Sequence, residues 1–456
     1  MKGNLIQIEI LILLLLMAFQ IQGQEPEIEL QLSKQEAFEL MLNNNFGIQI
    51  ARNELAIAEN NKSILNSDYL PTLSSNAGAT FDQANSITDF NGALDSDGNP
   101  RPDVEINDAE TKRYNAALSL NYTLFDGLGR YYNFKQLKET YNLTELQARE
   151  TIESTTLQLF TVYFEVARIQ ENLEALEQAL DISKNREQRA NYQFEYGQSN
   201  KLNVLNAQVD VTTDSINILN TEQLLENTRR DLNVILNRNL EQMMVVDTTV
   251  TFIDPIKLEE YFLELDRNNV TLLQADSNIL ISDYAIKNTR ALLLPSLGLN
   301  GSYGWNRNEN PASAFFPGTT NTSNTLTVGA TLRWDLFDGG RSINALKNAK
   351  IVYENQEILK QQLEQQVARD ILNARGDYEN SLKIYRMQEQ NVMTNRNNFE
   401  RSEEQLKLGQ ISSIEFRQAQ LNLLNAQVTK NSAKYAAKIA ELRYLQLVGQ
   451  LLNVEF

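Results

Sequence analysis

The chain has 456 residues, of which 42% are hydrophobic, and its formal net charge at pH 7 is −18. This charge argues against a nucleic-acid partner, because nothing offsets the repulsion of phosphate groups. The sequence contains neither histidine nor cysteine, so it lacks the commonest general base, the commonest zinc ligand and all thiolate or disulfide chemistry. We therefore predict no catalytic, cofactor-binding or metal site.

The first 23 residues are typical of a secretory signal peptide. Lys2 precedes an apolar run, 10–19, that is too short to cross a bilayer and is followed by small and polar residues. We expect cleavage after Gly23, with Ala18 as the alternative. No later stretch approaches the roughly 18 consecutive apolar residues of a membrane helix, so a mature protein that crosses a membrane would have to use strands.

A capping box marks the first predicted helix of the mature chain. Ser33 and Glu36 have the spacing at which a hydroxyl and a carboxylate bind each other's backbone amides. The amphipathic pattern that follows predicts one helix running toward Asp68 and ending before Pro71.

Four segments alternate between apolar and small or polar residues, which is the period of a strand with two unlike faces. They are 72–81, 113–124, 296–305 and 325–336. Strands of roughly 9–11 residues with an apolar outer face and aromatic residues near their ends are what an outer-membrane barrel needs. We assign a barrel aromatic girdle to Tyr114, Tyr122, Trp305 and Trp334. Any one of these segments alone would suit an ordinary half-buried sheet better.

The segment 82–112, between the first two strands, is predicted to be a long acidic loop. Its run 95–99, Asp-Ser-Asp-Gly-Asn, hints at calcium but lacks the spacing of an EF-hand. We expect an exposed loop and leave calcium binding open at this point. The corresponding loop of the second half, 306–324, is shorter and nearly neutral.

The chain is an internal duplication. Residues 36–81 align with 260–305 at a shift of 224, whereas Leu-Phe-Asp-Gly at 124–127 aligns with 336–339 at a shift of 212. The difference of twelve residues falls in the loop between the strands, where length changes are tolerated. We divide the chain into a signal peptide (1–23), a first repeat (24–236), a linker (237–260) with a strand-like run at 244–253, and a second repeat (261–456).

Very long helices follow each pair of strands. Apolar residues step by three and four along a coiled-coil seam, namely Ile152, Thr155, Leu159, Val162, Val166, Ile169, Leu173, Leu176 and Leu180. A helix from about 340 to about 405 would be roughly 100 Å long. Each half therefore reads helix, strand, loop, strand, long helix, glycine break and helix, which is an α+β fold that is mainly α.

Four strands cannot close a barrel, since small barrels need about eight. An open sheet in lipid would leave unpaired edges, so several chains must pool their strands. Narrow apolar seams on long, otherwise polar helices indicate a thin wall that is wetted on both sides. We interpret the chain as part of a water-filled conduit rather than as a catalyst.

The sequence resembles the outer membrane efflux protein family, the TolC-like channels. The resemblance rests on the repeat, on Leu-Pro before the first and third strands (70–71 and 294–295), on Leu-Phe-Asp-Gly after the second and fourth, and on the glycine in each helical turn. It implies a homotrimer with a twelve-stranded barrel in outer-membrane lipid and an α-helical periplasmic tunnel. It also implies a periplasmic membrane-fusion adaptor and an inner-membrane RND, ABC or MFS transporter as partners, in tripartite efflux or type I secretion.

The resemblance also implies two sets of site residues. The turns at Gly197-Gln198 and Gly409-Gln410 match the tips that face the adaptor, with a plain helix break as the alternative. Glu415 matches the first of the acidic positions that ring the periplasmic aperture, and Asn203 is its first-half counterpart. A trimer would gather three Glu415 carboxylates, which could attract cations; a solvated helix residue is the alternative.

The aperture positions depart from the family pattern in three places. Gln418 occupies the second acidic position, Ile411 replaces the arginine of the family channel's lock, and Leu406 replaces its tyrosine. A polar lock of that kind is therefore not expected in this chain.

Two competing hypotheses come from other classes of protein. A secreted coiled-coil structural or surface protein would explain the heptads but not the alternation in all four strands. A glycosidase working with carboxylates would use some of the many Asp and Glu residues, but no pair of them stands out.

Overall fold

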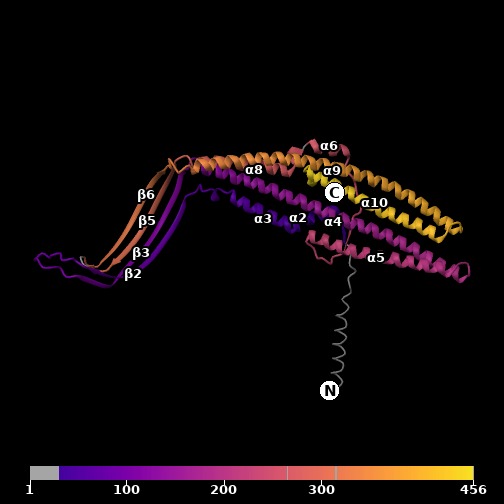
Figure 1. Cartoon of the computed structure of the whole chain (residues 1–456), viewed down its shortest axis with the longest axis horizontal. Coiled ribbons are helices and arrows are strands. Elements are labelled where there is room, and N and C mark those ends of the chain that lie inside the picture. The colour runs from indigo at the N-terminus through magenta and orange to yellow at the C-terminus, as the bar shows by residue number, and fades with distance from the viewer. Residues whose placement is uncertain (1–29, 264, 314–315, 455–456) are drawn as a thin grey trace, which may run out of the picture. The chain divides into compact units, whose positions relative to one another are not determined.

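The structure is a computed structural model that describes residues 30–263, 265–313 and 316–454 (Figure 1). It forms two compact units. Among the described residues, unit 1 comprises 30–52, 148–263, 265–270 and 364–454, and unit 2 comprises 53–147, 271–313 and 316–363. The predicted signal peptide, 1–23, lies outside the described residues.

Unit 2 contains a four-stranded antiparallel sheet in the order β2-β3-β5-β6. Its strands are β2 (Thr72–Thr88), β3 (Val104–Phe125), β5 (Ser296–Asn310) and β6 (Thr319–Arg333). All four predicted strands are present, and each keeps two unlike faces over the part that the sequence predicted. The chain enters the sheet from helix α3 (Phe46–Asn61) and a 3-10 turn at Ile64–Asn66, and enters β5 from helix α8 (Val270–Ala291).

The prediction of an acidic loop over 82–112 is wrong for most of this segment, which is strand instead. β2 and β3 keep pairing as far as Thr88 and Val104, past a register shift between Ala84 and Ser86. Most side chains there are polar, so the backbone ladder continues beyond the hydrophobic alternation that would have revealed it. The loop predicted at 306–324 is shortened in the same way, because β5 extends to Asn310 and β6 begins at Thr319.

The fourth strand ends at Arg333 and not at 336 as predicted. The residues that follow prepare the next helix instead, since the carboxylate of Asp338 accepts hydrogen bonds from the backbone amides of Gly340 and Ser342.

The sequence predicted a single helix from Ser33 toward Asp68, but the structure has two helices there, α2 (Lys34–Asn44) and α3. The capping box of Ser33 and Glu36 is confirmed. Asn45 makes the break: its backbone is extended, and its side-chain oxygen accepts hydrogen bonds from the amides of Gly47 at 2.9 Å and Ile48 at 3.3 Å. It therefore ends the first helix and caps the second.

The long helices confirm the internal repeat. Helix α4 (Gly129–Glu195) has 67 residues and is followed by α5 (Lys201–Leu236), with 36. Helix α9 (Arg341–Lys407) also has 67 residues and is followed by α10 (Ser413–Leu447), with 35. No helix in the described ranges is both long and apolar enough to cross a membrane.

Aromatic residues form the core of unit 1. Phe160, Tyr163 and Phe164 of α4 are completely buried, and the ring of Phe164 lies 5.8 Å from that of Tyr435 in α10. The hydroxyl of Tyr163 donates to the carbonyl of Leu32 at 2.7 Å and accepts from the amide of Asp247 at 2.9 Å. Tyr163 thereby fixes the short parallel pair of β1 (Leu30–Leu32) and β4 (Met244–Val246) against the helices.

The strand-like run predicted at 244–253 is a strand over its first three residues only. Its remainder is held by side chains of α10: Tyr435 donates to the carbonyl of Thr248 at 3.1 Å, and Lys438 donates to that of Thr251 at 2.8 Å. These bonds replace a ladder partner for the backbone. The chain then forms α6 (Pro255–Leu263) and α7 (Leu265–Asn268) and, after α10, a 3-10 turn at Leu451–Asn453.

Candidate functional site: the sheet and the helical turns

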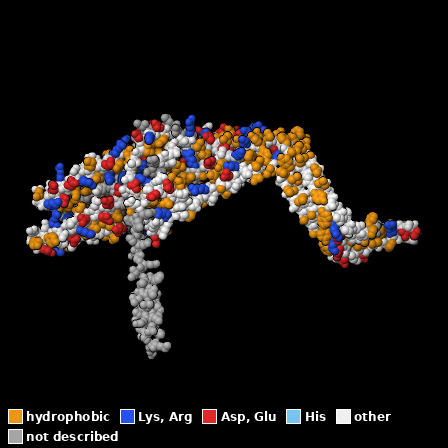
Figure 2. Space-filling view, turned by 180° about the vertical axis from the view of Figure 1, so that it is seen from behind, with side chains coloured by type: hydrophobic (Ala, Val, Ile, Leu, Met, Phe, Trp, Pro, Cys, Tyr) orange, Lys and Arg blue, Asp and Glu red, His pale blue; other side chains and the backbone are white. Residues whose placement is uncertain are grey.

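The sheet of unit 2 has one continuous apolar face. Register aligns Leu73 with Leu120, Leu120 with Gly301 and Gly301 with Val328, so the alternating patterns of the four strands coincide. This face consists of Leu73, Ala77, Ala79, Phe81, Tyr114, Ala116, Leu118, Leu120, Tyr122, Leu297, Leu299, Tyr303, Trp305, Leu326, Val328, Ala330 and Leu332. Many of these side chains are exposed, Val328 to 78%, and Figure 2 shows hydrophobic side chains gathered along the sheet. An exposed apolar surface of this extent marks a contact with lipid or protein.

The opposite face of the sheet is polar or small. It consists of Ser74, Asn76, Gly78, Thr80, Asn115, Ala117, Ser119, Asn121, Thr123, Gly298, Asn300, Ser302, Gly304, Thr325, Thr327, Gly329 and Thr331. A Cβ on Gly78 would lie 2.8 Å from Oδ1 of Asn115, so the glycine leaves room for that amide. One apolar and one hydrated face is the construction of a strand wall between lipid and an aqueous lumen.

The four aromatic residues assigned to a girdle lie near two levels of the apolar face. Trp305 pairs with Ala116, two residues from Tyr114, whereas Tyr122 pairs with Leu299 near the end of the sheet that leads into the helices. Trp334 follows β6 at that same end, and its Nε1 donates to the carbonyl of Leu293 at 3.3 Å. The eight residue-to-residue steps from Tyr114 to Tyr122 span about 26 Å at the rise of a strand, close to the ~25 Å apolar band of outer-membrane barrels. Contact of these four side chains with lipid stays a prediction.

The repeated Leu-Phe-Asp-Gly motif has a structural function that the sequence did not disclose. Asp126 Oδ2 accepts from the amide of Arg130 at 2.9 Å, and Asp338 Oδ2 accepts from that of Ser342 at 2.8 Å. Each aspartate thus satisfies a free amide in the first turn of a 67-residue helix. The aspartate four residues before the bonded amide is the signal that could have indicated this capping.

The glycine of the same motif turns the chain into the helix. Gly127 has a φ of +70°, and a Cβ there would lie 2.8 Å from Cβ of Leu294. Gly339 has nearly the same φ, +74°, with nothing within 4 Å of its Cβ position. Both turns need the left-handed backbone, but only the first is also tightly packed.

The two helical turns assigned to the tips have matching backbone geometry. Gly197 and Gly409 have φ values of +72° and +70°. The amide of Gln198 donates to the carbonyl of Gln193 at 2.7 Å, and that of Gln410 donates to Gln405 at 2.8 Å. Both turns therefore end their helices as Schellman motifs. Large apolar side chains are exposed at both: Tyr196, Leu202, Leu408 and Ile414.

Glu415, the predicted aperture residue, is the third residue of α10 and belongs to a capping box. Its Oε2 accepts from the amide and hydroxyl of Ser412 at 2.7 and 2.8 Å, and these bonds lower the pKa of the Glu415 carboxyl. Asn203 has the equivalent place in α5, where its amide donates to Oδ1 of Asn200 at 3.1 Å. These positions correspond locally, as the repeat predicted, and their lining of an aperture stays a prediction.

The remaining aperture positions make local contacts. Gln418 is exposed and donates from Nε2 to Oδ1 of Asn422 at 2.8 Å, whereas Leu406 and Ile411 are half-buried. All three side chains are uncharged, so none of them can form an ion pair.

A polar network that the sequence did not reveal joins three helices beside the turns. Arg417 of α10 binds Asp214 of α5, and Arg186 of α4 forms an ion pair with Asp210 of α5. Ser183 of α4 donates to Asp214 Oδ2 at 2.6 Å. Burial lowers the pKa of the Arg186 guanidinium, and the neighbouring Asp210 opposes this shift. The signal was present as the spacing of Asp210 and Asp214, which puts both carboxylates on one helical face.

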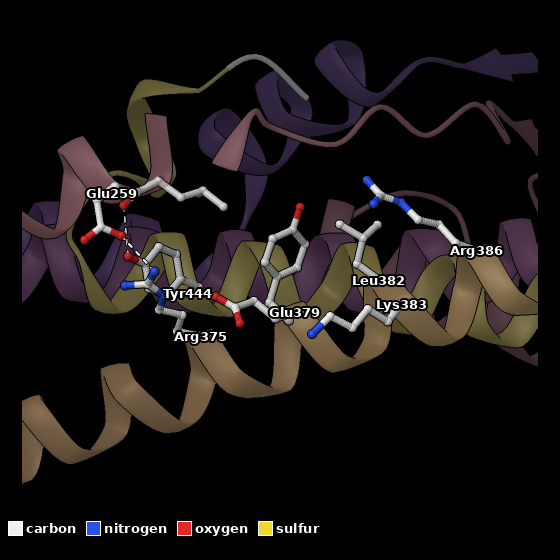
Figure 3. A pocket seen from close by; sticks show the side chains of 9 residues that line it. Glu259, Arg375, Glu379, Leu382, Lys383, Arg386 and Tyr444 are labelled. Atoms are coloured by element: carbon white, nitrogen blue, oxygen red, sulfur yellow. Dashed lines mark hydrogen bonds and ion pairs between the residues drawn. The ribbon is translucent and has the colours of Figure 1, made fainter. Parts of the chain in front are cut away.

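Unit 1 also has a cavity of about 230 Å³ between α6, α9 and α10 (Figure 3). Leu258, Leu382 and Tyr444 contribute apolar surface to it. The acids at its rim are tied to Arg375, which lies 2.8 Å from Glu259 and 3.1 Å from Glu379. The pair with Glu259 holds α6 to α9, whereas the pair with Glu379 lies within α9. Because its acids are already paired, we interpret the cavity as a structural contact between helices.

The acidic segment 95–99 forms a turn. Asp95 Oδ1 accepts from the amides of Asp97 and Asn99, both at 2.9 Å, and the bonds to this turn lower the pKa of the Asp95 carboxyl. Within the part of the chain that the structure describes, no group of three or more acidic residues is arranged to hold a metal ion. The hint of calcium in the sequence gains no support from this geometry.

An amphipathic sheet followed by two helical hairpins, each made of a 67-residue helix and a helix of 35 or 36 residues, is typical of a channel-type outer membrane protein. A family model described as outer membrane efflux protein matches residues 37–238 and 264–450, and the chain belongs to this family. Its localisation is accordingly the outer membrane, and the predicted TolC-like fold is confirmed.

Individual relatives are distant in sequence. The chain is 24% identical over 311 residues to outer membrane protein TolC of Vibrio cholerae, which covers 67% of this chain and 70% of that protein. The fold is similar to the CmeC outer membrane channel of Campylobacter jejuni, with a TM-score of 0.71 at 18% identity over 92% of this chain and 86% of the other. It is also similar to the MtrE outer membrane channel of Neisseria gonorrhoeae, with a TM-score of 0.68 at 18% identity over 92% and 89%.

Proposed function

We propose that three copies of the chain close a twelve-stranded barrel and form a passive export duct. The observation that carries this proposal is a four-stranded sheet with one apolar face, one polar face and two outer strands, β2 and β6. Because neighbouring strands are antiparallel throughout the order β2-β3-β5-β6, β6 of one copy can pair antiparallel with β2 of the next. Every edge then has a partner, as lipid requires.

The duct would receive its cargo from other proteins. A periplasmic adaptor would dock at the turns around Gly197 and Gly409, and an inner-membrane RND, ABC or MFS transporter would supply the energy in tripartite efflux or type I secretion. The exposed apolar side chains of Tyr196 and Leu408 support a protein contact at the two turns. We infer no enzymatic activity, since a conduit selects and conducts without making or breaking bonds.

The first test is the mass of the detergent-extracted protein by light scattering, corrected for bound detergent. Three chains per particle are expected, because they supply the strands that closure needs. A monodisperse single chain would leave four strands unclosed and would overturn the duct. Membrane fractionation distinguishes the alternative of a secreted coiled-coil protein, which alkaline carbonate would extract and a barrel would resist.

A further inference from the structure

The two long helices that leave the sheet begin with a concentration of positive charge. The first ten residues of α4, 129–138, contain three cations and no acid, and so do the first ten of α9, 341–350. Helices α2 and α10, by contrast, carry Glu36 and Glu415 in their first turns. In a chain with a net charge of −18, two basic segments directly after the strands need a local explanation.

In each helix, two of the three cations occupy positions that are equivalent between the two halves. Lys135 aligns with Lys347, and Lys138 with Lys350, at the shift of 212 that aligns the Leu-Phe-Asp-Gly motifs. Around them the halves have diverged, since Tyr131-Tyr132 aligns with Ile343-Asn344. The pattern Lys-x-x-Lys is therefore present twice in a duplication that has otherwise changed.

The four lysines are available to a ligand. Among the ion pairs of the described residues, none involves Lys135, Lys138, Lys347 or Lys350. Lys138, Lys347 and Lys350 are exposed, and Lys135 is half-buried. An ammonium group that no carboxylate neutralises attracts an external anion.

The lysines of α4 point back toward the sheet. Nζ of Lys135 lies 5.8 Å from the ring centre of Tyr131, and Nζ of Lys138 lies 4.4 Å from that of Phe134. Both rings are four residues nearer the helix start, the direction in which helical side chains lean. Lys135 is six residues into α4, about 9 Å along its axis, so its ammonium comes nearer still to the end of the apolar sheet face.

We propose that these Lys-x-x-Lys pairs bind the phosphate groups of anionic phospholipids in the leaflet next to the helical end of the sheet. The inference rests on the proposed membrane-spanning function of the strands. Two observations select this occupant: the lysines lie in the first three turns of the helices that follow Tyr122 and Trp334, and their charge complements phosphate. The polar zone of a bilayer is about 5–7 Å deep on each side, and a charge acts over about 8 Å at physiological salt, so the pairs fall within reach of headgroups.

The chain has only two tryptophans, Trp305 and Trp334, which supply a local test. In a Trp305→Phe variant, Trp334 alone reports lipids at the helical end. The purified oligomer would be reconstituted with phosphatidylcholine and phosphatidylglycerol, with either lipid brominated to quench tryptophan on contact. Because one lysine near an anionic surface changes binding about fivefold, we expect brominated phosphatidylglycerol to be preferred at Trp334 by at least about threefold, and the preference to fall between ~0.15 M and ~1 M salt.

Variants assign the preference to the lysines. Changing all four lysines to Gln is expected to bring the ratio of quenching by the two brominated lipids at Trp334 close to one. Changing one pair only (Lys135→Gln with Lys138→Gln, or Lys347→Gln with Lys350→Gln) is expected to lower this ratio in part. Changing all four lysines to Arg is expected to leave the ratio unchanged. A matched control replaces four exposed lysines of unit 1 by Gln and should leave it unchanged: Lys184, Lys201, Lys383 and Lys407. A Trp334→Phe variant, which reports through Trp305, should show no preference.

Each contrary result has a distinct meaning. Equal quenching of Trp334 by both brominated lipids would overturn the phosphate site and leave the membrane-spanning sheet intact. A preference that survives the fourfold Gln variant would overturn its assignment to these lysines. Quenching by neither lipid at either tryptophan would overturn the inference together with the proposed barrel.

Discussion

The guanidinium of Arg417 in α10 donates two hydrogen bonds to the carboxylate of Asp214 in α5, from Nη1 to Oδ2 at 2.8 Å and from Nη2 to Oδ1 at 2.6 Å. The side chain of Asp214 is 2% exposed and that of Arg417 11%. A two-pronged bond of this kind fixes orientation as well as distance. It therefore couples the helix that follows the second turn to the helix that follows the first.

Arg417→Met is expected to loosen α10 where it meets α5. Removing one partner of a buried ion pair leaves the other charge uncompensated, at a cost of about 3 kcal/mol. Hydrogen exchange of the amides around Phe416 and Leu424 should accelerate about 100-fold, which is the corresponding factor. The control is Arg168→Met, whose partner Glu165 is 43% exposed, and which should cost below about 1 kcal/mol. If both variants had the same amide exchange rates, the pair of Arg417 and Asp214 would stabilise the structure no more than an exposed ion pair does.

The two repeats of Leu-Phe-Asp-Gly predict unequal effects of one substitution. Gly127→Ala and Gly339→Ala both place a Cβ on a left-handed backbone, which costs roughly 1–2 kcal/mol. Only at Gly127 would the new methyl group also meet another atom, Cβ of Leu294, at 2.8 Å. We therefore expect the first variant to yield less folded oligomer and to unfold at a lower temperature. Indistinguishable thermal unfolding of the two variants would show that the contact with Leu294 relaxes freely.

Much of this architecture could be predicted from the sequence because periodicity reports burial on one face. The strand alternation at Tyr114–Leu124 and the heptad seam through Leu159 both have that origin, and the glycine breaks follow from backbone conformation. Periodicity failed where both faces are in water, as in the extension of β2 to Thr88. It also failed where one side chain interrupts a pattern, as Asn45 does. The Arg417 network joins residues more than 200 positions apart. The spacing of Asp210 and Asp214 marks one helical face, but no local pattern identifies Arg417 as its partner.

Alkaline pH is expected to destabilise unit 1 through its buried and half-buried tyrosines. Burial raises the pKa of Tyr385 to about 12, and the hydroxyl also donates to Glu389 at 2.8 Å. An unfolded tyrosine loses its proton near pH 10, so above that pH the unfolded state binds fewer protons and the free energy of unfolding falls. The stabilisation is complete below about pH 10 and is lost as pH rises toward 12. Absorbance of phenolate should increase together with loss of helix; early ionisation of all tyrosines without unfolding would contradict the burial.

Gly409→Pro should separate the function of the turn from that of the sheet. Proline cannot adopt the φ of +70° found at Gly409, so the Schellman turn should be lost while the strands of unit 2 are unaffected. We expect normal amounts of trimer in the outer membrane and loss of export, measured with a drug-sensitive host. Gly376→Ala serves as the control, because Gly376 lies inside α9 with nothing within 4 Å of its Cβ position. Loss of membrane insertion in the proline variant would refute this separation.

Glu415→Ala tests whether three carboxylates meet at an aperture. If they do, bilayer recordings should show a lower preference for cations over anions, because fixed negative charge at a constriction attracts cations. The substitution also removes a capping box, so its control must remove an equivalent one elsewhere. Glu36→Ala does so, since Glu36 binds the amide and hydroxyl of Ser33 at 3.0 and 2.8 Å as Glu415 binds Ser412.

The two capping variants should therefore have similar local effects on their helices and different effects on conduction. Hydrogen bonds from serine lower the pKa of both carboxyls, so both remain ionised at neutral pH, and only a carboxylate at the constriction can influence permeating ions. As pH falls through these lowered pKa values, both caps weaken, whereas cation preference should fall with the protonation of Glu415 alone. Unchanged selectivity in Glu415→Ala, or an equal change in Glu36→Ala, would count against the acidic ring and would leave Glu415 with capping as its function.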